Sequence, residues 1–535
     1  MRSRALRARP DHPAVPPWPP RLSVAGLVYL RGQDADGRLR ELACERARAR
    51  PVLGELALAL LEKKGPRELG FRSLGDWARE RLGLDARTVR EWALVWKRLG
   101  ELPLLRRAVL AGEIGWTVAG EAARLATPES EAACLETVRG RTVRAVKELV
   151  AAVRRAELRA TGKEVAGGSA EEAEEEDAER VRVRIPCSPE LARKWAVACE
   201  LARRVAGEEL SAWACAEAIA AECASAIGFP SGDPEPGIWR ERRKTGWRES
   251  REHGLRHWVW PRLRWAASRE KPSRLQRLVE GAAEATPREL DRRLRAATGF
   301  LQSVDLEIGR VLRQVRDRRL YRELGFPSFE RFVIERLDLA GSTARRLVRM
   351  ARAEHSHPAV ATAFREGRIT LLQAETLLRG GSLEFAQKVT LRRLEEEVLP
   401  GEVDFWAPPE VARLFQAMVE AMGGLEALLD HALVTWLGMQ QKSHHYRIYK
   451  RDGWRCAMPG CTARRGLHAH HVQFRSRRGG GRAWNLLTLC VAHHQYLVHA
   501  GLVRITGRAP ARIVFETGVG RFASGDVKLA DEDRS

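Results

Sequence analysis

No stretch of the 535-residue sequence contains the roughly 18–20 consecutive apolar residues that a membrane-spanning helix needs. The apolar run from Leu22 to Leu30 is too short, and wrongly flanked, for a secretory signal. These two absences predict a soluble, cytoplasmic protein that has no membrane partner.

Lysine is scarce, since only 12 of the 92 basic residues are lysine, and part of the arginine excess therefore reflects the codon usage of a GC-rich genome. Acidic residues number 70, fewer than the 92 basic residues, which leaves a formal net charge of +22. Clustered cations gain free energy by releasing counterions from phosphates. The charge predicts a polyanionic partner, DNA first, although RNA or an anionic surface would satisfy charge alone. No small-molecule substrate is implied.

Most of the nine cysteines are not placed as metal ligands. Six stand singly in apolar helical patterns, where a thiol acts as a small buried hydrophobe: Cys44, Cys134, Cys187, Cys199, Cys215 and Cys223. Only the three cysteines near the C-terminus have ligand spacing.

From about Leu39 the apolar residues recur at three- and four-residue spacing, which predicts a mainly α fold of two to four domains. We divide the chain as follows: a disordered proline- and arginine-rich segment (1–37), helical copy one (38–160), an acidic linker (161–180), a strand and helix pair closing copy one (181–228), a basic Trp/Arg-rich linker (229–285), helical copy two (286–440), a histidine- and cysteine-rich domain (441–510), and a C-terminal strand and tail (511–535).

The two helical copies are inferred from an internal repeat with a constant offset of 255 residues. The run 67–73 (RELGFRS) returns as 322–328 (RELGFPS), and the same offset pairs Gly112 with Gly367 and Ile114 with Ile369. Chance identities do not keep one register over this distance. The sequence therefore predicts a duplicated helical module, closed in each copy by a short strand and a helix pair.

Each copy contains a pattern typical of helix–turn–helix. In copy two, Ser342 is expected to cap a second helix that carries Arg345, Arg346 and Arg349. Arginines on such a helix suit the major groove and its flanking phosphates. Helical hairpins also serve as packing units, so a scaffold or homodimer interface stays an alternative.

Each of the two linkers has two alternative interpretations. The acidic run 171–179 is a solvated linker or an autoinhibitory mimic of DNA. The region 239–277 combines tryptophans with arginines, which is typical of a linker or of a surface that stacks single strands.

Cys456-x4-Cys461 and Cys490-x2-His493 form two ligand pairs about thirty residues apart. Two chain turns with this spacing can close a tetrahedral zinc site with three thiolates and one imidazole. Such a site is structural, because it stabilises a domain too small to bury its own core.

The remaining histidines predict a second site. If 467–474 is a strand, the side chains of His470 and His471 point to opposite faces. A glycine-rich loop follows, then Asn485, and a helix from residue 491 onward carries His494 back toward His470. His499 comes five residues after His494, about 140° round an ideal helix, so it binds metal only if the helix is distorted. The loop offers four arginines for phosphates: Arg475, Arg477, Arg478 and Arg482.

The ordered set from 446 to 501 resembles the HNH (His-Asn-His) endonuclease family, and the helical region before it is similar to those fused to bacterial HNH domains. The resemblance implies a ββα-metal fold in which His471 is the general base and Asn485 orients it through the loop. It also implies that His470 and His494, with His499 undecided, hold one divalent ion, Mg²⁺ or Mn²⁺, beside the structural Zn²⁺.

We therefore predict a metal-dependent DNA endonuclease that leaves 5′-phosphate and 3′-hydroxyl ends. The alternatives are a DNA-binding regulator that keeps the zinc-stabilised HNH fold without cleavage, and an interaction protein built on the helical copies.

Overall fold

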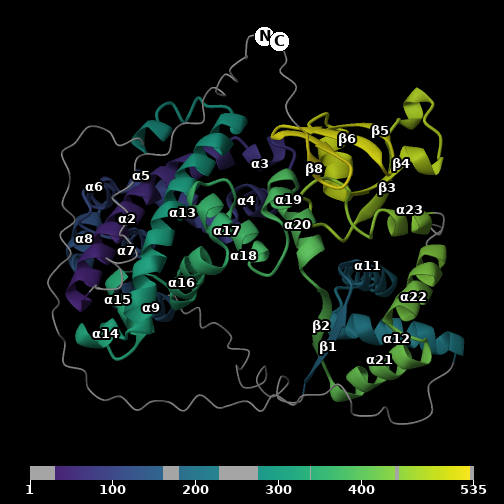
Figure 1. Cartoon of the computed structure of the whole chain (residues 1–535), viewed down its shortest axis with the longest axis horizontal. Helices are drawn as coiled ribbons and strands as arrows, with labels where there is room; N and C mark the ends of the chain where they lie inside the picture. The colour runs from purple at the N-terminus through teal and green to yellow at the C-terminus, as the bar shows by residue number, and fades with distance from the viewer. Residues whose placement is uncertain are drawn as a thin grey trace, which may run out of the picture. The chain divides into compact units, whose positions relative to one another are not determined.

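The structure is a computed structural model, and it describes residues 31–141, 143–160, 180–227, 275–337, 339–439 and 445–529. It is mainly helical, with small antiparallel sheets (Figure 1). Within these ranges no helix is both long and apolar enough to cross a membrane. The acidic run and the tryptophan-rich part of the second linker lie outside the described residues.

The chain forms two compact units, and each contains segments from both halves of the sequence. Unit 1 comprises 1–162 and 262–387, and unit 2 comprises 163–261 and 388–535.

Unit 1 is helical throughout its described part. Its first segment holds α2 (Gly32–Glu62), α3 (Gly65–Glu68), α4 (Leu74–Leu82), α5 (Ala86–Glu101), α6 (Pro103–Leu110), α7 (Trp116–Ala122), α8 (Glu131–Val138) and α9 (Val143–Ala160). Its second segment holds η1 (Gln276–Leu278), α13 (Pro287–Asp317), α14 (Leu320–Glu323), α15 (Phe329–Leu337), α16 (Gly341–Ser356), α17 (Pro358–Arg365), α18 (Leu371–Leu377) and α19 (Leu383–Lys388). The bounds of α2 to α7 recur as those of α13 to α18 with an offset of 255 residues.

Helix ends in unit 1 follow local sequence signals. Ser73 caps α4 by accepting from the backbone N–H of Asp76, and Asp85 caps α5 in the same way. The cap expected at Ser342 is different: α16 begins at Gly341 after Ala340, so Ser342 lies inside the first turn and caps nothing. Alanine offers no side-chain acceptor, so this helix begins without a side-chain cap.

The long helices α2 and α13 pack against each other, and two ion pairs with buried aspartates accompany them. Arg81 of α4 donates to Asp291 of α13 (Nη2–Oδ2 2.6 Å), and Arg336 of α15 donates to Asp36 of α2 (Nε–Oδ1 2.7 Å). Asp36 and Asp291 are 255 residues apart, as are Arg81 and Arg336. The contacts are thus reciprocal, as in a two-fold interface.

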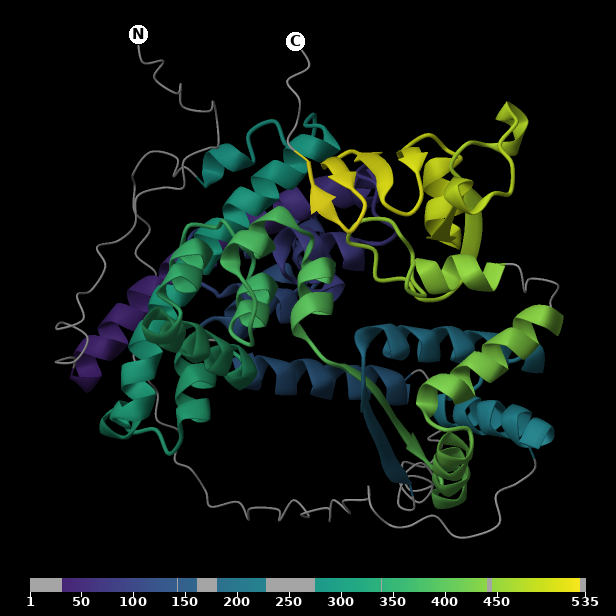
Figure 2. The same ribbon diagram turned by 45° about the vertical axis from the view of Figure 1, so that its right-hand side comes forward.

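Unit 2 opens with β1 (Val181–Cys187), which pairs antiparallel with β2 (Gly401–Ala407) (Figure 2). The inner faces of this ribbon bury Val183 and Phe405, and Phe405 stacks on Trp195 with ring centroids 5.4 Å apart. The helices around the ribbon are α11 (Pro189–Ala206), α12 (Ala212–Ile227), α20 (Leu391–Val398), α21 (Pro409–Ala421) and α22 (Leu425–Met439).

The C-terminal part of unit 2 is rich in short elements: α23 (Tyr446–Arg451), β3 (Leu467–His471), η3 (Arg475–Arg477), η4 (Ala483–Asn485), β4 (Leu486–Cys490), η5 (Ala492–Val498), β5 (Arg504–Arg508), β6 (Arg512–Thr517), β7 (Gly520–Ala523) and β8 (Val527–Lys528). Strands β3 and β4 form one hairpin, and β5 to β8 form a four-stranded antiparallel sheet. This sheet is larger than the strand and tail expected for 511–535, because its strands are too short to show clear alternation.

Candidate metal centres

Four buried side chains bring three sulfurs and one imidazole together. Cys456 and Cys461 lie in the loop after α23, Cys490 ends β4, and His493 is in η5. The four ligand atoms all lie within 4.8 Å of one another. The Nδ1 atom of His493 is 3.5 Å from the sulfur of Cys456 and 3.3 Å from that of Cys490.

This donor set fits a zinc ion. Ligands at about 2.0–2.3 Å from a tetrahedral zinc are separated by about 3.3–3.8 Å, close to the contacts seen here. Hydrogen bonds from Cys456, Cys461 and His493 lower the pKa of Cys490 far below its ordinary value. Burial lowers the pKa of His493, but contacts with Cys456 and Cys490 outweigh burial and raise it to about 10. Burial, followed by hydrogen bonds with Cys456 and Cys490, raises the pKa of Cys461 well above its ordinary value. The cluster therefore holds protons that a dication would displace on binding.

A buried arginine holds the turn that carries the first two cysteines. Arg392 of α20 donates to the carbonyl of Cys456 (2.8 Å) and to that of Cys461. Its other donors meet Asp526, which also accepts from the backbone N–H of Gly460 (3.2 Å). We call Arg392, Asp526 and the bonded turn the knuckle clamp.

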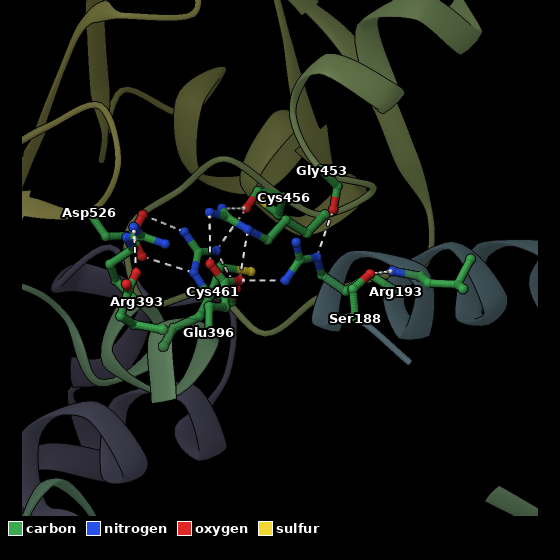
Figure 3. Close-up of polar contacts among 12 residues, drawn as sticks. Ser188, Arg193, Arg393, Glu396, Gly453, Cys456, Cys461 and Asp526 are labelled. Carbon is green, nitrogen blue, oxygen red and sulfur yellow. Dashed lines mark hydrogen bonds and ion pairs between the residues drawn. The ribbon is translucent and has the colours of Figure 1, made fainter. Parts of the chain in front are cut away.

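A second ion-pair group lies next to the clamp. Glu396 of α20 pairs with Arg455 (2.8 Å) and with Arg193 of α11 (3.2 Å). Arg193 also donates to the carbonyl of Gly453 (2.7 Å). Within unit 2, these contacts tie the metal-binding loop to α11 and α20 (Figure 3).

Three histidines form a second cluster, with His470 on β3, His494 in η5 and His499 just after η5. One ring nitrogen from each lies within 4.8 Å of the others, and the Nε2 atoms of His494 and His499 are 3.3 Å apart. The Nε2 atom of His470 is buried without a hydrogen-bond partner. Burial, followed by the charges of His494 and His499, lowers the pKa of His470 to about 3. An unpartnered, neutral imidazole nitrogen facing two others fits a metal ion.

The position of His499 depends on the shape of η5, which is a π-helix. The backbone N–H of His499 bonds the carbonyl of His494, five residues earlier (3.3 Å). The wider turn of a π-helix reduces the angle between side chains five residues apart, and His499 lies with its Nε2 atom 3.3 Å from that of His494, whereas Val498 is buried. The helix is thus distorted in the way that ligation by His499 requires.

His471, next to His470, is half-buried, and its Nε2 lies 3.3 Å from the Nε donor of Arg475. Burial and then the charge of Arg475 lower the pKa of His471 below its ordinary value. The ring is therefore neutral near pH 7 and can accept a proton.

Asn485 is fully buried and bonds the loop that follows His471. Its Oδ1 accepts from the backbone N–H of Gln473 (2.7 Å), and its Nδ2 donates to the carbonyls of Gln473 (3.1 Å) and Gly480 (2.8 Å). Gly479 allows this fold, since a Cβ there would lie 1.7 Å from the Gln473 carbonyl oxygen. Asn485 thus braces the loop that begins beside His471.

One neighbour of the cluster, His468, was not predicted from the sequence. The Nδ1 atom of His468 lies 3.0 Å from Nδ1 of His494. The available signal was strand alternation, because His468 is two residues before His470 and shares its face.

The two sets of predicted DNA-binding arginines differ in environment. The side chains of Arg475, Arg477, Arg478 and Arg482 are exposed on the loop. On α16, by contrast, Arg346 makes a two-bond pair with Glu375 (2.9 and 2.6 Å). Arg349 lies 4.0 Å from Glu375, and Arg345 lies 3.6 Å from Glu330. Acidic neighbours therefore offset the α16 charges.

Comparison with family models, curated proteins and solved structures finds no match to this chain.

Proposed function

We propose that the protein is a metal-dependent DNA endonuclease of the HNH type, in which β3, β4 and η5 act as the ββα-metal unit. One observation supports this most strongly. The nitrogens of His470, His494 and His499 lie within 4.8 Å of one another beside His471, a half-buried imidazole that follows directly in sequence.

In this proposal His470, His494 and His499 hold a divalent ion. The ion would stabilise the charge that develops on the phosphate and on the leaving 3′ oxygen. His471 would accept a proton from the attacking water at Nε2, its unprotonated nitrogen. Arg475 donates to that nitrogen in this structure, so its guanidinium must move away, for instance onto a phosphate, before the water can take its place. The braced loop holds the ring. The expected ends are 5′-phosphate and 3′-hydroxyl.

The donor set bears on which ion is used. Imidazole nitrogens suit transition-metal ions, whereas Mg²⁺ prefers oxygen ligands in octahedral geometry. Of the two ions that the resemblance implies, we expect Mn²⁺ to support cleavage at a lower concentration than Mg²⁺.

We also infer that the helical halves arose by duplication. The matching bounds of α2 to α7 and α13 to α18, and the reciprocal Arg–Asp pairs, support this inference. Only the second half is followed by the histidine cluster, so one chain has one nuclease centre. A single encounter should nick one strand, and a double-strand break needs a second chain or a second encounter.

Incubation of the full chain with supercoiled plasmid tests the proposal. We expect nicked circles to form first with Mn²⁺ or Mg²⁺ and none with the metal chelated, and the nicks to be sealed by DNA ligase, which requires 5′-phosphate and 3′-hydroxyl ends. Unchanged plasmid, despite zinc in the protein and measurable DNA binding, would favour the non-cleaving regulator.

A further inference from the structure

The tip of the β5–β6 hairpin lies against the end of the basic loop. The backbone N–H of Ala509 donates to the carbonyl of Trp484 (2.9 Å), and the guanidinium carbon of Arg508 lies 4.7 Å from the centroid of the Trp484 ring. Trp484 comes two residues after Arg482. The hairpin tip is therefore placed beside the end of the loop that starts at the candidate catalytic base.

The tip carries two exposed arginines directly opposite each other. Arg508 and Arg512 are paired residues in the β5–β6 register. Like charges at facing positions destabilise a hairpin. In the part of the chain that the structure describes, no carboxylate pairs with either side chain.

The backbone at Gly507 brings strands β5 and β6 into close contact. Gly507 has φ +103°, and a Cβ on it would lie 1.9 Å from the carbonyl oxygen of Arg512. Any other residue would push the strands apart. The hairpin thus keeps two unneutralised guanidinium groups together, an arrangement that an anion would stabilise.

The other end of the same sheet is charge-balanced. Arg504 faces Glu516 across the strands, and Arg521 of β7 pairs with Glu516 (3.8 Å). The unbalanced charge is confined to the end nearest the basic loop, so a general excess of arginine does not explain it.

We propose that Arg508 and Arg512 form a phosphate-binding point for the DNA backbone, which extends the contact surface of the loop onto the β5–β6 hairpin. Guanidinium groups bind phosphate through paired N–H donors. Stacking on Trp484 orients the Arg508 plane and leaves its edge available. This inference rests on the proposed function for its partner, DNA, but not on cleavage.

The test measures binding of the full chain to a fluorescent DNA duplex at several salt concentrations, without added divalent ion. Each phosphate contact contributes about 0.9 to the slope of log affinity against log salt. We expect Arg512→Gln to weaken binding and to reduce the slope by about 0.9, and Arg508→Gln to do the same. Arg521→Gln is the matched control, because it changes the net charge equally but removes an arginine that already has an acidic partner.

Arg512→Gln is the decisive variant, since its side chain is exposed and its loss removes no stacking on Trp484. The inference is wrong if the wild type binds DNA but the slopes of Arg508→Gln and Arg512→Gln both equal that of Arg521→Gln. That result would leave the proposed nuclease activity unaffected. If the slope falls as expected but wild-type protein leaves plasmid intact, the binding point stands and the proposed cleavage fails. A wild type that binds no DNA would overturn both.

Discussion

At the scale of single residues, the contact between His468 and His494 has a consequence for metal binding. If Nε2 of His494 faces His470 and His499, its Nδ1 must carry the proton and donate it to Nδ1 of His468. A ligand whose second nitrogen is held in this way has its tautomer and ring orientation set in advance.

Replacement of His468 by alanine should therefore weaken metal binding while His470, His494 and His499 remain. We expect the affinity for Mn²⁺ to fall by about 10–100-fold, the usual effect of removing such a partner. Titration of Mn²⁺ followed by electron paramagnetic resonance measures this without any cleavage. His357→Ala, which removes an exposed histidine of unit 1, serves as the control. Equal affinities for the two variants would show that His468 does not position His494.

At the scale of elements, the knuckle clamp joins α20 and the β7–β8 turn to the cysteine loop. Burial raises the pKa of Asp526, but Arg392 outweighs burial and holds it below its ordinary value. A carboxyl with a depressed pKa in the folded state contributes stability above its unfolded pKa, about 3.9. That contribution is lost as the pH falls below this value toward the folded pKa.

Asp526→Asn should lower the free energy of unfolding by about 3–5 kcal/mol, because Arg392 stays buried without its ion-pair partner. Urea unfolding of both proteins measures this difference, and it should shrink as the pH is lowered below about 4. Arg393→Gln is the control, since Arg393 pairs with exposed Glu397 on the same helix and should change stability by less than about 1 kcal/mol. We also expect Asp526→Asn to release zinc faster to a chelator. A loss as small as that of Arg393→Gln would mean that the clamp is not a stabilising element.

The sequence predicted the Cys456, Cys461, Cys490 and His493 cluster from spacing, because cysteine and histidine pairs at turn distances limit the geometry strongly. The proposed ligand roles of His470 and His494 came from the resemblance to the HNH family, which left His499 undecided. It did not predict the π-helix that brings His499 beside His494, since a period of 3.6 residues is the default for an apolar pattern. It also missed the knuckle clamp, because Arg392 and Asp526 are 134 residues apart and nothing local links them.

At the scale of the whole molecule, the two halves of the sequence do not form separate units. Each compact unit contains segments from both halves. Both long helices belong to unit 1, and both closing strands pair in unit 2. The constant offset of 255 residues predicts duplication. A sequence repeat does not indicate, however, whether an element packs within its own copy or against the other copy. The register of β1 with β2, over 200 residues away, follows from tertiary structure alone.

The reciprocal ion pairs give a test of this arrangement by stability. Arg81→Ala and Arg336→Ala each remove one ion-pair partner of a buried aspartate and should cost about 1–3 kcal/mol in the free energy of unfolding. We expect losses of similar size, because each aspartate keeps one further partner. Asp291 keeps a hydrogen bond from Trp77 (2.9 Å), and Asp36 keeps an ion pair with Arg40.

Arg144→Ala is the control, because Arg144 pairs with Glu148 on an exposed helix face and should change stability by less than about 1 kcal/mol. Chemical denaturation of the three variants makes the comparison. If Arg81→Ala and Arg336→Ala are as stable as the control, the reciprocal pairs do not hold the halves of unit 1 together.

In the proposed mechanism, His471 acts as a base beside a metal ion held by three histidines. The initial rate of plasmid nicking with Mn²⁺, compared between wild type and His471→Ala at equal zinc content and equal DNA binding, tests it most directly. We predict a rate about 10²–10⁴-fold lower for His471→Ala, with the His357→Ala control at the wild-type rate. Nicking by His471→Ala at the wild-type rate would contradict the account.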